Sequence, residues 1–121
     1  MLSKPLTPGR SLPDNGPVPA RFIALWGKPT DPDAFEAHYR TVHLEIVRRW
    51  PKLESYRVTR ITGSPLGGEP PYAVLFEATF ASEEDLREAL RSSEVAEAGR
   101  DAVELSRRFG ATLVVLTGVD L

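Results

Sequence analysis

The chain has 121 residues, enough for one domain and too few for two of ordinary size. Hydrophobic residues make up 41% and charged residues 26%, a composition typical of a folded globular domain. The net charge of −2 argues against a dedicated nucleic-acid binder, and the lack of cysteine excludes disulfides, thiolate nucleophiles and cysteine-ligated metal centres. Because no apolar run is long enough to span a bilayer and no secretory signal is recognisable, we expect no membrane partner and a cytoplasmic location.

Residues 1–19 are unusually rich in proline. Five of the eleven prolines fall in this segment. Each proline fixes φ and removes a backbone N–H donor, so neither a helix nor a central strand is expected here. We predict a disordered arm over 1–19, with an extension that covers a partner as the alternative, followed by one domain over 20–121.

The body begins with a buried strand and a long amphipathic helix. Residues 22–26 form an apolar run that a glycine ends, as in a strand buried on both faces. Asp31 is a suitable N-cap and Pro32 suits the first turn, so a helix is predicted from here to Pro51. Its apolar stripe, at steps of three and four, consists of Phe35, Tyr39, Val42, Ile46 and Trp50.

The remainder of the chain predicts two strands, a helical region and a last strand. Ser82-x-x-Asp85 resembles a capping box that opens a helix, and a further helix ends at Gly110 after a basic last turn. A loop rich in glycine and proline separates the second and third strands. Residues rich in β-branched and aromatic types predict strands over 55–62, 72–80 and 111–119.

The resulting order, β-α-β-β-α-β, is that of the ferredoxin-like fold. This α+β arrangement has a four-stranded antiparallel sheet with its helices on one face. Strand residues 74–76 and 113–116 are apolar on both faces, although the helices cover only one. A monomer would therefore expose a large apolar patch. We expect a homodimer whose sheets pack back to back.

The two histidines are the candidates for chemistry, and both lie in the first predicted helix. At about 100° per residue, five residues place His38 and His43 about 140° apart, on opposite flanks. They are therefore not expected to bind one metal ion, and we predict no metal site. His43 lies on the broader apolar side, one turn after Tyr39, whereas His38 is expected nearer to solvent. Since histidine titrates near neutral pH, His43 is the leading general acid or base; the alternative is a helix-edge histidine bonded to a backbone group or to water.

Motifs for other chemistry are lacking in the sequence. The Gly67-Gly68 loop has no Lys-Ser/Thr pair of the kind that a phosphate loop needs, so we expect no cofactor of that type or any other. Arg57 and Arg60 occupy opposite faces of the second predicted strand. Whichever faces the helices could bind an acidic substrate, with solvation at the sheet edge as the alternative.

Several motifs form a recognisable combination. The first predicted helix contains Phe35-x-x-His38-Tyr39-x-x-x-His43, and Pro51-x-Leu53-x-x-Tyr56 leads into the next strand. Further matches are Phe80-x-Ser82-x-x-Asp85-Leu86 and Ala98-x-x-Asp101. Over residues 21–119 these motifs resemble the EthD family. The sequence departs from that family at Glu45, where a proline is usual.

The resemblance implies a dimeric α+β barrel, related to muconolactone isomerases, small polyketide cyclases and cofactor-free monooxygenases. It also implies a pocket between sheet and helices for a small hydrophobic or aromatic compound. Two functions remain open: a cofactor-independent oxygenase, isomerase or cyclase with His43 as acid/base, or a non-catalytic small-molecule-binding or accessory dimer. The expected pocket residues, for which ordinary core packing is the alternative, are Trp26, Tyr39, His43, Tyr56, Val58, Val74, Phe76 and Phe109.

Overall fold

A computed structural model describes residues 16–121. The predicted arm thus lies largely outside the described residues; its last part leads into the sheet, where the Pro19 carbonyl accepts a hydrogen bond from the backbone N–H of Asp120 at 3.1 Å. Within 16–121, no helix is both long and apolar enough to cross a membrane. In chain order the elements are β1 (Ala20–Trp26), α1 (Pro32–His38), the π-helical segment η1 (Tyr39–His43), α2 (Leu44–Val47), β2 (Leu53–Arg60), β3 (Val74–Phe80), α3 (Glu83–Leu90), α4 (Ser93–Phe109) and β4 (Leu113–Val119).

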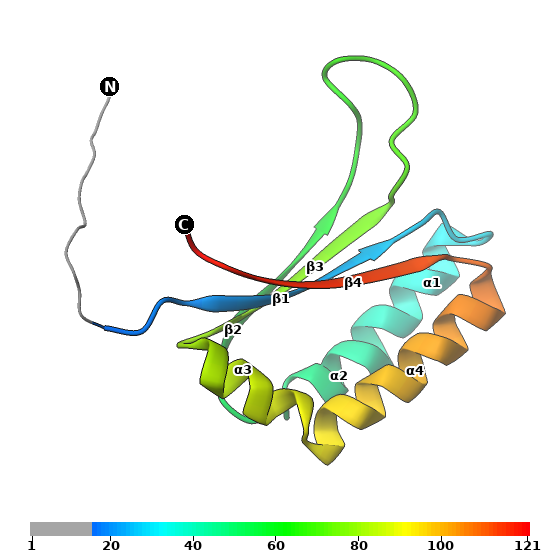
Figure 1. Ribbon diagram of the computed structural model, residues 1–121. Helices are drawn as coiled ribbons and strands as arrows, with labels where there is room; N and C mark the ends of the chain where they lie inside the picture. Colours follow the sequence, from blue (N-terminus) through cyan, green and yellow to red (C-terminus); the bar gives the residue numbers. More distant parts are fainter. Residues whose placement is uncertain (1–15) are drawn as a thin grey trace.

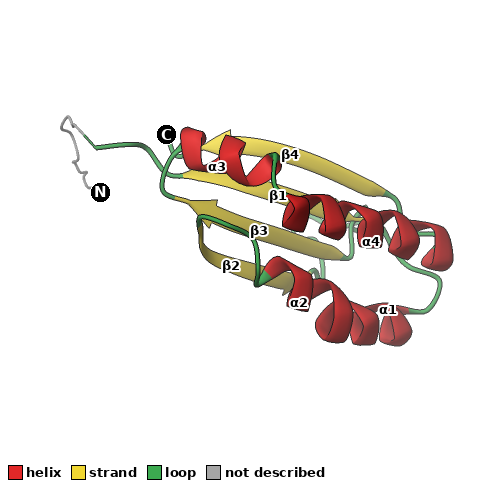
Figure 2. Cartoon of the chain, turned by 90° about the horizontal axis from the view of Figure 1, so that it is seen from below, coloured by secondary structure: helices red, strands yellow, loops and turns green. Residues whose placement is uncertain are grey.

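The strands form one antiparallel sheet in the order β2-β3-β1-β4. All helices lie on one side of this sheet, and the other side is bare (Figure 1). Seen from the helical side, α1 and α2 lie over the β2 and β3 half of the sheet, and α4 lies over the other half (Figure 2). The short helix α3 packs against β1 and β3. This confirms the predicted ferredoxin-like fold.

The helices begin where the sequence predicts them, because short polar side chains satisfy the first free N–H groups, whereas the first helical region, predicted to run to Pro51, ends at Val47. The carboxylate of Asp31 accepts from the backbone N–H of Ala34 at 3.1 Å, and the Ser82 hydroxyl accepts from that of Asp85 at 3.1 Å. Ser92 caps α4 in the same way. Gly110 ends α4 in the left-handed region, with φ 64°, where a side chain is disfavoured.

Alternation along the strands divides the sheet into a core face and an open face. On β1 and β3 the even-numbered residues face the helices, and those of β3 are all buried. The odd-numbered residues therefore face the open side. There Leu25 pairs with both Leu75 and Val114, and Ile23 pairs with Leu116. We call these five apolar residues the open-face cluster; Val114 is 36% exposed and Leu116 49%.

The first helix departs from the prediction in its middle. At η1 the backbone N–H of Leu44 donates to the carbonyl of Tyr39, five residues back rather than four. This wider turn changes which side chains face inward: Val42 is 41% exposed, whereas His43 and Leu44 are buried. The predicted apolar stripe is therefore wrong at Val42.

Candidate active site

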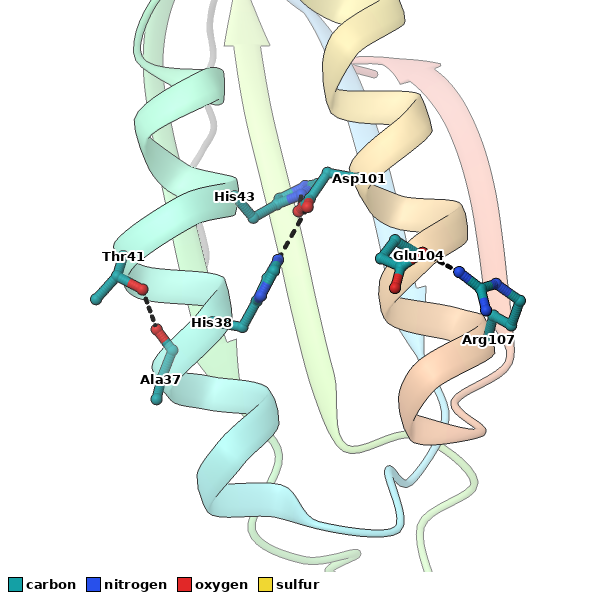
Figure 3. A network of polar contacts seen from close by, with 7 residues as sticks. All are labelled: Ala37, His38, Thr41, His43, Asp101, Glu104 and Arg107. Carbon is teal, nitrogen blue, oxygen red and sulfur yellow. Dashed lines mark hydrogen bonds and ion pairs between the residues drawn. The ribbon is translucent and has the colours of Figure 1, made fainter.

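The π-helical segment brings both histidines to one face of the helix. An i→i+5 bonding pattern places residues five apart close to one another around the axis. The Thr41 hydroxyl donates to the carbonyl of Ala37 at 2.8 Å within this segment. Figure 3 shows the side chains of His38 and His43 both pointing across to α4. The prediction that they occupy opposite flanks is wrong, because it assumed a regular α-helix of about 3.6 residues per turn.

Both imidazoles bind one carboxylate, that of Asp101 on α4 (Figure 3). The Nδ1 atom of His43 lies 2.8 Å from Oδ2 of Asp101, and the Nε2 atom of His38 lies 2.9 Å from Oδ1. The three side chains are only 8%, 18% and 12% exposed for His43, His38 and Asp101 respectively. Since a carboxylate only accepts hydrogen bonds, each of these imidazole nitrogens is the donor.

This arrangement fixes the chemistry of the His43 ring. With the hydrogen on Nδ1, the neutral ring has its lone pair on Nε2, which can accept a proton. Burial lowers the pKa of His43, although the hydrogen bond to Asp101 and its charge act in the opposite direction. The lowered pKa favours a neutral His43 ring at pH 7, and a carboxylate sets the orientation of that ring.

A cavity of about 230 Å³ lies beside His43, between the sheet and the helices. Small side chains make the room: Ala24 lies on β1, and Ala98, Gly99 and Ala102 lie on α4. The wall beside the imidazole is aromatic. The Tyr39 ring stacks on that of His43 with centroids 4.8 Å apart, and the Trp26 ring meets His43 edge-on at 6.5 Å. The other lining residues are Phe22, Trp50, Phe76, Val95, Val103, Leu113 and Val115.

The structure brings together four of the eight residues expected at the pocket: His43, Trp26, Tyr39 and Phe76 line this cavity. The other four lie elsewhere. Tyr56 stacks on Phe76 with centroids 6.1 Å apart, outside the cavity lining. Phe109 is buried edge-on against Phe35 in the core.

Val58 and Val74 line a separate groove of about 270 Å³ beside α1. Two of its charged groups pair with each other, since Arg60 donates to both carboxylate oxygens of Glu36 at 2.7 and 2.6 Å. Arg60 is thus the arginine of β2 that faces the helices. It pairs with Glu36 of the same chain, where an acidic substrate had been considered as the partner. Within residues 16–121, no group of three or more His, Cys, Asp or Glu side chains could hold a metal ion.

Sequence reasoning missed Asp101 and His38 as members of the site. Asp101 is 58 residues beyond His43, so no local spacing connects them. The available signal was a pair of motifs, Phe35-x-x-His38-Tyr39-x-x-x-His43 and Ala98-x-x-Asp101. They contain the two histidines and the aspartate that meet in the structure.

Comparison of this chain with known proteins identifies the family to which its sequence is similar. A family model described as "EthD domain" matches residues 27–107. The crystal structure of an EthD-family protein from Bacillus halodurans is 32% identical, with a TM-score of 0.76 over 85% of this chain and 99% of that chain.

Two more distant structures share the fold. A dimeric ferredoxin-like protein of unknown function from Thermobifida fusca is 17% identical, with a TM-score of 0.62 over 86% of this chain and 92% of that one. SnoaB, a cofactor-independent oxygenase from Streptomyces nogalater, is 15% identical, with a TM-score of 0.59 over 84% and 92% of the two chains.

Proposed function

This chain belongs to the EthD family, and we propose that it is a cofactor-independent enzyme that acts on a small hydrophobic or aromatic compound. One observation carries the proposal: His43, held by Asp101, lies on the wall of an aromatic cavity. A neutral, buried imidazole with a carboxylate behind it is the arrangement expected of a general base. The fold shared with a cofactor-independent oxygenase supports the same reading by analogy only.

In the proposed reaction, Nε2 of His43 takes a proton from the bound compound. The electron pair of the broken bond stays on the compound, and the positive charge that develops on the imidazole is stabilised by Asp101. From such an anion the outcome is isomerisation if the proton returns at another atom, cyclisation if the anion attacks within the molecule, or oxygenation if dioxygen takes the electrons. His38 acts as a positioning residue, because its N–H holds the second oxygen of Asp101.

We also propose that the protein is a homodimer that buries the open-face cluster. Exposed apolar side chains on a bare sheet face favour a second copy as the cover. The fold shared with a protein described as dimeric supports this. The expected cytoplasmic location stays a prediction.

The test is turnover of a panel of aromatic ketones and phenols by protein treated with a chelator, in air and under nitrogen. We expect conversion of at least one compound, with a rate that falls at acidic pH as His43 becomes protonated, and loss of conversion in His43→Gln. The control is Thr41→Ser, which keeps the hydroxyl bonded to the Ala37 carbonyl. Binding without conversion, or full conversion by His43→Gln, would instead favour the accessory-protein alternative.

A further inference from the structure

We infer that the cavity selects an uncharged aromatic compound that donates a hydrogen bond from a hydroxyl group, and that Nε2 of His43 is the acceptor. The inference rests on the proposed function to the extent that it takes the same cavity and the same imidazole as the substrate site. It adds the chemical class of the ligand and the atom that selects it.

The side chains around the cavity leave one polar atom that a ligand can reach. Nε1 of Trp26, the hydroxyl of Tyr39 and Nε1 of Trp50 each have less than 1 Å² of accessible surface, so the protein itself closes them off from a ligand. Apart from these three residues and His43, every lining residue has a hydrocarbon side chain or is glycine. Among the lining side chains, the recognition of a polar group on the ligand therefore falls to His43.

The atom that His43 offers is Nε2. Its Nδ1 atom is occupied, because it lies 2.8 Å from Oδ2 of Asp101. Nε2 has no hydrogen-bond partner in the part of the chain that the structure describes, and it is not among the fully enclosed polar atoms. The 8% of this side chain that stays exposed thus includes Nε2. Since an unpartnered polar atom in a buried side chain costs free energy, a ligand that completes it is favoured.

The protonation of the imidazole decides which ligand group completes it. Because the Asp101 carboxylate only accepts, Nδ1 of His43 carries the hydrogen, and Nε2 of the neutral ring only accepts. Burial lowers the pKa of His43, which favours that neutral ring. A hydroxyl satisfies Nε2, whereas an ether or ketone oxygen does not. A phenolic hydroxyl, with an ordinary pKa of about 10, is also acidic enough to transfer its proton toward an imidazole more readily than an aliphatic hydroxyl.

The charges around the cavity favour an uncharged ligand. Tyr39 and His43 are the titratable groups among its described lining residues, and none of that lining is Lys, Arg, Asp or Glu. The carboxylate of Asp101, behind the His43 ring, repels an anion. Its two oxygens are each bonded to an imidazole N–H, so they are not free to pair with a cation. The ligand therefore enters as the neutral hydroxyl compound.

The size and walls of the cavity favour an aromatic skeleton. Its volume of about 230 Å³ exceeds the roughly 150 Å³ at which an apolar cavity accommodates benzene. Phe22 meets Trp50 and Phe76 edge-on in its wall, with centroids 5.3 and 6.2 Å apart. Ala24 and Ala98 contribute only a methyl group each to the lining. The cavity thus offers aromatic and methyl surface around a space larger than one benzene ring needs.

The test compares 1-naphthol with its methyl ether, 1-methoxynaphthalene, which keeps the oxygen but has no hydrogen to donate. The ether is the more apolar of the two, so the hydrophobic effect alone would favour the ether. In calorimetric titrations at pH 7.5, we expect wild-type protein to bind 1-naphthol at least about fivefold more tightly than the ether, the effect of one net hydrogen bond. We expect the anion 1-naphthoate to bind more weakly than 1-naphthol. The ¹⁵N resonance of Nε2 in His43 should shift further with 1-naphthol than with the ether.

Two variants separate the hydrogen bond from the shape of the cavity. His43→Phe keeps an aromatic ring but removes the acceptor, so the preference for 1-naphthol should fall to twofold or less. Val115→Ala, which changes the lining without changing a polar side chain, is the matched control and should keep the preference. Thermal melting shows whether each variant is folded, and the wild-type titrations and spectra stand without any variant.

Equal or tighter binding of the ether, tighter binding of 1-naphthoate, or a preference that persists in folded His43→Phe would overturn the inference. Because these assays measure binding alone, they are independent of the proposed activity. A preference for 1-naphthol without turnover of any compound would refute the proposed enzyme and leave the ligand class standing. Turnover without that preference would overturn the ligand class and leave the enzyme standing.

Discussion

Gly99 offers a substitution that should stabilise the fold and close the site at the same time. It lies in the middle of the 17-residue helix α4 and lines the cavity, where it is exposed. A Cβ atom added at this position meets no atom within 4 Å. The backbone there needs no glycine, so replacing Gly99 removes only the entropic cost of glycine in a helix.

The expected magnitude follows from that helix position. Ala in place of Gly in a helix interior is worth about 0.5–1 kcal/mol, and Leu is close to Ala in helix propensity. Both Gly99→Ala and Gly99→Leu should therefore raise the free energy of unfolding by about that amount, which corresponds to a rise in Tm of a few degrees. Because Gly99 lines the cavity, we expect the larger leucine side chain to occupy part of the space that a ligand needs.

The two variants should separate in binding. We expect Gly99→Ala to bind an aromatic ketone, 1-tetralone, as wild type does, and Gly99→Leu to lose at least tenfold in affinity. Ala96→Leu, at an exposed position of α4 outside the cavity lining, is the control and should keep wild-type affinity. Thermal melts and calorimetry measure both effects. A destabilised Gly99→Ala would show that the helix needs glycine at this position, and wild-type affinity in Gly99→Leu would show that ligand does not bind beside it.

Three further perturbations test the site and the assembly. Asp101→Asn should reduce turnover by about 10²-fold or more, because an amide cannot accept from both imidazoles and its NH₂ group favours the wrong His43 tautomer; full activity in steady-state assays would contradict this. As pH falls below the ordinary histidine pKa of about 6.5, wild type should lose stability relative to His43→Gln, because the unfolded chain binds a proton that burial denies to His43; denaturant titrations from pH 7.5 to 5 measure the difference, and parallel pH profiles would refute it. If the proposed homodimer forms through the open-face cluster, Leu116→Arg should give a folded monomer, since it places a charge in that cluster; light scattering that shows a dimer in this variant would exclude that interface.

The sequence predicts the fold well where each element depends on its own residues. Asp31, Ser82 and Gly110 mark helix ends through local hydrogen bonds and backbone conformation, and the structure places those ends there. The strand order follows from the β-α-β-β-α-β pattern. The bare apolar face follows from strands such as β3, where apolar residues occur on both sides.

The site is less predictable, because it depends on two features without a local signal. One extra residue in a single helical turn decides whether His38 and His43 diverge or converge, and nothing in the helix pattern marks that turn. Asp101 comes from a distant helix, so its role follows only from tertiary packing. Likewise, Phe109 has the same apolar character as Phe76, and only packing decides that the first lies in the core and the second at the cavity.

In the proposed site, Asp101 accepts a hydrogen bond from each histidine and thereby makes His43 a base at Nε2. Imidazole ¹⁵N chemical shifts at pH 7.5 test it without any substrate, since they distinguish a protonated ring nitrogen from an unprotonated one. We predict that His43 is neutral with its hydrogen on Nδ1, that Nε2 of His38 carries a hydrogen, and that Asp101→Asn changes the His43 pattern. A wild-type His43 with its hydrogen on Nε2, or one unaffected by Asp101→Asn, would exclude Nε2 of His43 as the base.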